Sequence, residues 1–333
     1  MTPAELSRTV LSAVRRAVEA GELQLSGPVP DRVVVRRPPR PGCGDYATNV
    51  ALQLAPLTGA PPPAVADVIR GHLTALPGIA RVDVAHPGFL NITLEGESYG
   101  ALVDLVRAQG PRYGIGSHHA PAPEQAPAPT GEAPTGEARA DTLAAALDRL
   151  RRATGITPPD RRPHPVRQTA DELLRTLGPD ATAWALLRPP AEDAPRTDPA
   201  EHLAQRESNP LFRVRYAHAR ARALLRNAHD LGIAPGAAED LRHPAEAELL
   251  GLIADFPRTV EAAARHGAPD RLARHLEHTA DAFLRFHDTC PALPKGDEKP
   301  SAVHGNRLAL ADAAGTVLAN GLTLLGISAP RHL

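Results

Sequence analysis

Cysteine, tryptophan and lysine are scarce in this chain. Its 333 residues include two cysteines, Cys43 and Cys290, and one tryptophan, Trp184. Two cysteines this far apart argue against a disulfide scaffold and a multi-cysteine metal site. The 37 basic residues are arginines except for Lys295 and Lys299. With the abundant alanine and proline, this indicates the codon bias of a GC-rich genome, so arginine content alone is weak evidence for RNA binding.

Long apolar runs and an excess of one charge are also missing. The apolar runs are short and interrupted, so none is expected to cross a bilayer. The N-terminal segment mixes acids and arginines with apolar residues, which is typical of an amphipathic helix and not of a signal peptide. We therefore expect a cytoplasmic protein that does not contact membranes. Because the formal net charge is −1, nucleic-acid binding would have to come from local patches.

Signals for catalysis or metal binding are weak. The pair at 118–119 is two histidines without neighbouring ligands, so we predict no metal site. Cys43 has no obvious histidine and acid partner, and we expect an inert thiol. The acids show no paired-carboxylate spacing of the kind that acid–base catalysis uses. The sequence thus predicts no catalytic residue, no metal and no cofactor.

The first 116 residues alternate helical and strand-like segments, which predicts a small α/β domain. Periodicity and start signals predict helices at 6–20, 49–57, 64–76 and 99–109. β-branched and alternating runs predict strands at 32–36, 80–85 and 89–94.

The remainder divides into a linker and a helical region. Residues 117–141 are rich in proline and alanine and repeat PTGEA in tandem, which predicts a disordered linker. From Thr142 onward every periodic segment is helical, and Pro257 is expected to end one helix at Phe256. The expected class is therefore α+β, with a small α/β domain at 1–116, a linker at 117–141 and a helical bundle at 142–333.

Several ordered stretches carry a resemblance to a known family. Near the N-terminus they are GDYATNVA at 44–51 and HPGFLNI at 86–92, closed by Tyr113 and Gly114. Further on come LGPDATAW at 177–184, NPLFRVRYAHAR at 209–220 and the C-terminal run from 309 to 330. Together they resemble the N-terminal additional domain and the anticodon-binding domain of arginyl-tRNA synthetase.

The departure from that family lies between the two similar regions. Synthetases of this class carry an HIGH-type motif and usually a KMSKS-type loop, and neither occurs here. The nucleotide-binding fold is replaced by the linker and one predicted helix. The resemblance therefore implies a non-catalytic protein that binds tRNA, with arginine tRNA as the default.

Site residues follow from the resemblance. The positions implied to contact the anticodon arm are Arg213, Tyr216, Arg220, Arg222, His287 and Leu333. Those implied to contact the D-loop are Phe89 and Asn91. Arg213 and His287 stand where the family usually has tyrosine, and Leu333 stands where it has methionine. The changes at Arg213 and His287 put the family's anticodon specificity in doubt.

The residues themselves support RNA contact on the helix near Leu211. Five arginines and no acid occur from Asn209 to Asn227, and helical geometry places them in two ridges between apolar faces. Guanidinium groups bind phosphates and stack on splayed bases. The alternative is a solvated helix face whose arginines pair with acids elsewhere in the fold.

Three functions stay open at this point. The first is an adaptor that holds tRNA and presents it to a partner enzyme that uses aminoacyl-tRNA. The second is the tRNA-binding subunit of a split synthetase or ligase that is completed in trans. The third is a protein-interaction domain that has lost RNA binding. The net charge and the two substituted tyrosine positions support the third.

Overall fold

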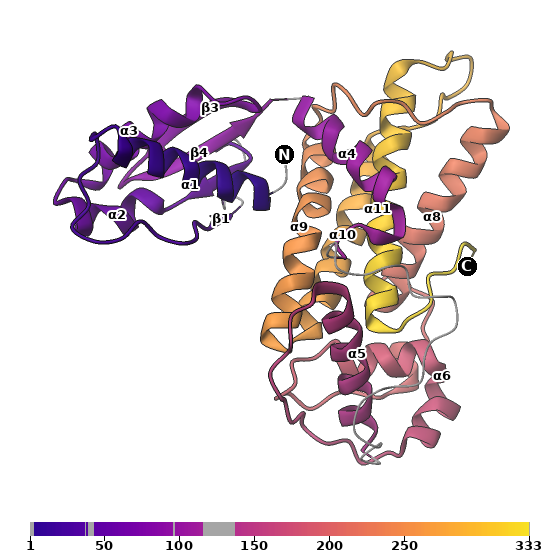
Figure 1. The fold of residues 1–333 in the computed structure, drawn as a ribbon. Helices are drawn as coiled ribbons and strands as arrows, with labels where there is room; N and C mark the ends of the chain where they lie inside the picture. The colour runs from indigo at the N-terminus through magenta and orange to yellow at the C-terminus, as the bar shows by residue number, and fades with distance from the viewer. Residues whose placement is uncertain (1–2, 37, 39–42, 96, 116–136, 333) are drawn as a thin grey trace. The chain divides into compact units, whose positions relative to one another are not determined.

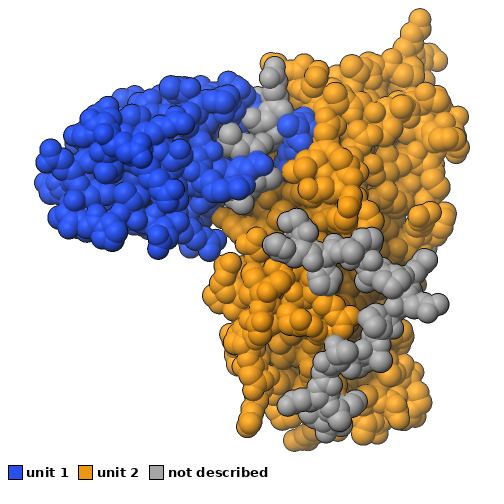
Figure 2. Space-filling view, viewed as in Figure 1, with its two compact units in different colours: residues 1–102 blue, residues 103–333 orange. Residues whose placement is uncertain are grey.

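A computed structural model describes most of the chain. The described residues are 3–36, 38, 43–95, 97–115 and 137–332. They form two compact units, unit 1 at 1–102 and unit 2 at 103–333, coloured separately in Figure 2. The domain boundaries expected from sequence at 116 and 142 stay predictions, and the histidine pair at 118–119 lies outside the described residues.

Unit 1 is an α/β layer structure, as the sequence predicts (Figure 1). Its antiparallel sheet has the order β1-β2-β4-β3. The strands are β1 Val35–Arg36, β2 Tyr46–Thr48, β3 Ile79–Ala85 and β4 Phe89–Leu94. The helices are α1 Pro3–Glu19, α2 Val50–Thr58 and α3 Pro62–Thr74. A strand was expected at 32–36, but only residues 35 and 36 form one.

The sheet of unit 1 has one buried and one open face. Along β4, Leu90, Ile92 and Leu94 are buried in the core formed with the helices, while Phe89 and Asn91 alternate with them. Because successive strand residues point to opposite faces, Phe89 and Asn91 share the face away from that core.

Unit 2 is a helical bundle, which confirms the predicted fold class. It contains the second half of α4 Glu97–Gln109, which spans the border of the units. Its other helices are the short η1 Gly110–Arg112, α5 Ala138–Thr154, α6 Ala170–Leu187, α7 Pro199–His202, α8 Pro210–Asp230, α9 Pro244–His266, α10 Pro269–Thr289 and α11 Ala302–Leu325.

The prediction that Pro257 ends a helix is wrong. Helix α9 continues through Pro257 to His266. Proline has no N–H, so it leaves the carbonyl of Ile253, four residues earlier, without its helical donor. The Tyr113 hydroxyl donates to that carbonyl at 2.9 Å, which replaces the missing bond. A donor from a distant segment therefore allows the helix to continue.

The end of the predicted linker is also different in the structure. Helix α5 begins at Ala138, so residues 138–141 are helical, whereas 117–136 lie outside the described residues. The Glu137 side chain caps the helix by accepting a hydrogen bond from the Ala140 N–H at 2.6 Å. The Arg139 side chain then enters the interior of unit 2, where it is 1% exposed.

Helix α11 corrects the expectation about apolar runs. By length and composition it is apolar enough to cross a membrane. However, 78% of its apolar window is buried inside unit 2. This burial is that of a core helix of the bundle, surrounded by α8, α9 and α10.

Candidate nucleic-acid interface

Three arginines of α8 pair with acids from other helices. The pairs are Arg213 Nε to Asp281 Oδ1 at 3.3 Å, Arg215 Nη2 to Asp180 Oδ2 at 3.6 Å and Arg222 Nη1 to Asp312 Oδ1 at 3.1 Å. All six side chains are partly buried. These arginines therefore fasten α8 to α10, α6 and α11, which is what the alternative interpretation of the arginine ridges predicts.

Arg220 is exposed and has a different kind of partner. Its Nε donates to the imidazole Nε2 of His287 at 3.1 Å. His287 stacks on Phe283 with ring centroids 6.1 Å apart and planes 16° apart. Burial lowers the pKa of His287, and the positive charge of Arg220 lowers it further. The neutral imidazole can accept the hydrogen bond, so the guanidinium plane is held in place at the surface.

An aromatic pair lies beside Arg220 on the same helix. Tyr216 is 38% exposed. Its ring stacks on Phe212 with centroids 5.8 Å apart and planes 17° apart. Four residues separate Tyr216 from Arg220, which places them on neighbouring turns of α8. The arrangement offers a stacking platform beside a cation.

The last residues of the chain return to α8. His218 Nδ1 lies 2.9 Å from the carbonyl oxygen of Pro330. Arg226, which is exposed, donates to the carbonyl of Arg331 at 3.3 Å. This part of the described chain therefore runs beside α8, whereas Leu333 lies outside the described residues.

The two residues predicted in unit 1 lie on neighbouring positions of one sheet face. Phe89 is 39% exposed, so it is not part of the core. Asn91 pairs in register with Ala47 of β2 and Asp83 of β3. An exposed ring beside an amide is able to stack on a base and to bond its edge.

Sequence reasoning missed the acids that face α8. Asp180, Asp281 and Asp312 come from three helices and share no spacing with the arginines they meet. Their pairing depends on how the helices pack, so a single sequence gives no signal for it. Arg222 in particular contacts Asp312 and lies against Gly315, where an added Cβ would meet its Nη2 at 2.8 Å.

Comparison with known proteins gives the same two regions. Residues 4–94 match the model of the arginyl tRNA synthetase N terminal domain, and residues 214–333 match the DALR anticodon binding domain. The arginine–tRNA ligase of Frankia alni is 44% identical over 170 residues, which cover 50% of this chain and 31% of that protein. The chain thus spans about a third of the length of that relative.

Solved structures share the fold at low identity. Thermus thermophilus arginyl-tRNA synthetase aligns with a TM-score of 0.65 at 16% identity, covering 100% of each chain. The Plasmodium falciparum enzyme aligns with a TM-score of 0.61 at 9% identity, covering 98% of this chain and 99% of that one. The two matching models define the class, which is a protein with an arginyl tRNA synthetase N terminal domain and a DALR anticodon binding domain. The chain is an arginyl-tRNA synthetase-related protein, as its motifs predict.

Proposed function

We propose that the protein binds tRNA and performs no aminoacylation itself. The anticodon arm contacts unit 2 at α8 and α10, and the D-loop contacts the open sheet face of unit 1. Arginine tRNA is the default cargo, because the related enzyme of Frankia alni is an arginine–tRNA ligase. In this proposal the protein is cytoplasmic and presents its tRNA to a partner that uses aminoacyl-tRNA.

The Arg220 cluster carries the proposal. We define it as Arg220, His287, Tyr216, Phe212 and Phe283. It combines an exposed guanidinium, held by a neutral imidazole, with a half-exposed phenol ring that is already stacked. Single-stranded loops of RNA are bound by this combination, in which rings and guanidinium planes stack on unstacked bases. The rings are preorganised, so little side-chain entropy is lost on binding.

The other predicted residues have unequal roles in this proposal. Arg213 and Arg222 each keep an acidic partner, so we assign them to positioning α8 rather than to direct contact. Phe89 and Asn91 form the second contact, on unit 1. Two weak contacts in one chain gain affinity because binding at one raises the effective concentration at the other.

Internal pairing of the arginines also supports a second candidate, a protein-interaction domain without RNA binding. Arg213, Arg215 and Arg222 leave fewer free cations on α8 than the sequence suggests. A tRNA-binding subunit of an enzyme completed in trans fits the same surfaces as the adaptor, and co-purification of a synthetase-like partner would favour it.

The proposal is tested by the affinity of the full chain for tRNA as salt is varied. We expect binding that weakens with salt, because phosphate contacts release counterions. Arg220→Ala should weaken it by about 1–3 kcal/mol, the value of one stacking contact. The matched control is Arg265→Ala, which removes an exposed arginine of α9 whose only ion pair among the described residues is a long one to Glu261.

The outcomes separate the candidate functions. Binding that is lost with Arg220→Ala and kept with Arg265→Ala supports the Arg220 cluster. Absence of salt-dependent tRNA binding in the wild-type protein overturns the proposal and favours the protein-interaction domain. Sequencing of small RNA that co-purifies from the native cells would then identify the cargo.

A further inference from the structure

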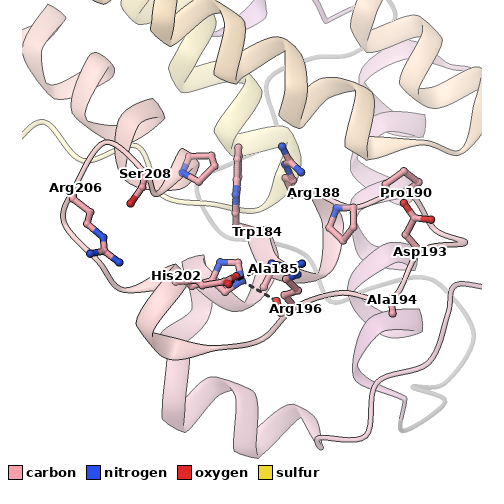
Figure 3. Close-up of a pocket in the computed structure, with 13 residues that line it drawn as sticks. Trp184, Ala185, Arg188, Pro190, Asp193, Ala194, Arg196, His202, Arg206 and Ser208 are labelled. Carbon is pink, nitrogen blue, oxygen red and sulfur yellow. Dashed lines mark hydrogen bonds and ion pairs between the residues drawn. The ribbon is translucent and has the colours of Figure 1, made fainter.

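A second candidate site lies in unit 2, at the start of α8. It is a cavity of about 620 Å³, within the range of small-molecule sites. Figure 3 shows Trp184 in the middle of its lining residues, with Arg206 on one side and Asp193 on the other. Trp184 is 1% exposed, and its indole N–H makes no hydrogen bond within the described part of the chain. This nitrogen is not among the buried side-chain atoms that lack a partner, so solvent or a ligand in the cavity is able to accept from it.

One side of this cavity is held in place by the buried Arg139, which lies behind it. Its guanidinium donates to five backbone carbonyls, those of His164, Leu186, Pro189, Pro190 and Asp193. Three of these residues, Pro189, Pro190 and Asp193, line the cavity. All five N–H groups of the side chain are used, so the segment that follows α6 is fixed in one conformation. The side of the cavity formed by Pro189, Pro190 and Asp193 is therefore preorganised.

The lining combines cations with acids. Arg188 is held by two bonds to Glu277, at 2.9 and 3.3 Å, which fixes the plane of its guanidinium. Arg196 is 82% exposed and only 3.5 Å from Glu201. The side chain of Arg206 makes no hydrogen bond or ion pair with any described residue. The lining thus offers one free guanidinium and one that is fixed.

We propose that this cavity binds a nucleotide, with Arg206 and Arg196 on the phosphate, the Arg188 plane beside the base, and Asp193 and Glu201 accepting from hydroxyl or amino groups. A simple anion or an acidic peptide would gain no stabilisation from the carboxylates of Asp193 and Glu201. A nucleotide presents donors as well as a phosphate, so it complements both signs of charge. The Trp184 N–H supplies one more donor to a base acceptor.

The nucleotide has two possible sources, a free mononucleotide or an unstacked residue of a bound RNA. The RNA source rests on the proposed function. Pro210 lines the cavity, and Arg220 follows it by ten residues on the same helix, which is about 15 Å along the axis. One RNA strand that contacts the Arg220 cluster can therefore reach the cavity.

The test uses Trp184 as its reporter, since it is the single tryptophan of the chain. The full-length protein is titrated with AMP and, separately, with tRNA, while tryptophan emission is followed. Free tryptophan amide in parallel titrations corrects for light absorption by the ligands. The variant is Arg206→Glu, which changes an exposed side chain and breaks no described contact, and Arg265→Glu is its matched control.

We expect a saturable change in emission with at least one ligand, weakened at least about tenfold by Arg206→Glu and unchanged by Arg265→Glu. A response to AMP indicates a free mononucleotide, and a response to tRNA alone indicates an RNA residue. If tRNA binds in a separate filter assay while Trp184 stays silent with both ligands, the cavity inference is wrong and the proposed function stands. If AMP changes the emission while the filter assay detects no tRNA binding, the cavity inference holds and the tRNA proposal fails.

Discussion

The interiors of the two units are built from different chemistry. Among the described residues, unit 1 buries apolar side chains and a single polar residue, Thr48. Unit 2 buries a larger polar set, which is Arg139, Thr182, Asn209, His218, Glu246, Asp270, His275, Glu277, Thr279, His304 and Asn320. Apolar burial stabilises without fixing directions, whereas hydrogen bonds need defined geometry. The helices of unit 2 are therefore more tightly specified, and more vulnerable to single polar changes.

The largest effect that this comparison predicts is that of Arg139→Met. The change keeps a long unbranched side chain but leaves five carbonyls without their donor. Unit 2 should lose about 3–5 kcal/mol of unfolding free energy. Amide hydrogen exchange of the full chain, resolved by peptide, measures the two units separately. An equal loss of amide protection in unit 1 would contradict the difference between the two interiors.

Acid should destabilise unit 2 through His275. Burial lowers its pKa from 6.5 to about 4, and its Nε2 has no partner among the described residues. The unfolded chain therefore binds the proton first as pH falls, so the stability that the neutral ring permits is complete above about 6.5. Between that pH and about 4, unit 2 should lose roughly 3 kcal/mol.

Urea unfolding followed by Trp184 emission tests this pH dependence. The His275→Gln variant, which does not titrate, should show a flatter decline than the wild type over the same range. His218 and His287 have pKa values lowered by burial as well, so a smaller acid dependence remains in the variant. An unchanged slope in His275→Gln would assign the dependence to those two residues instead.

The smallest predicted effect concerns the proline inside α9. Tyr113→Phe removes the donor to the Ile253 carbonyl and should cost about 1–2 kcal/mol of unfolding free energy. In a Pro257→Ala background the restored backbone N–H can take its place, so the same change should cost less. Urea midpoints of the four proteins give the coupling between the two positions. Additive losses would mean that the tyrosine does not act through that carbonyl.

Sequence patterns predicted the long periodic elements well. Helix α8 and the strands β3 and β4 appear where the sequence pattern places them, because periodicity reports directly which face is buried. The short strand β2 was not predicted. Its three residues pair with β4 and β1, so the strand depends on neighbours that are distant in sequence.

The placement of the candidate site residues could be predicted only in part. The motif around α8 pointed to Arg220 and Tyr216, which the structure places together at the surface with His287. The acidic partners of Arg213 and Arg222 could not be predicted, because these contacts form only when the helices pack. The same holds for Arg139, which lies in a segment predicted to be a linker and bonds to distant carbonyls.

The five hydrogen bonds of Arg139 also restrict which residues can replace it in related sequences. At most surface positions an arginine could be replaced by lysine with little effect on stability. The near absence of lysine at these positions reflects the codon bias that the sequence indicates. At position 139 the exchange is barred by geometry, since lysine offers three donors from one nitrogen and cannot reach five carbonyls. In a relative from an AT-rich genome, this arginine should be retained after its neighbours have changed.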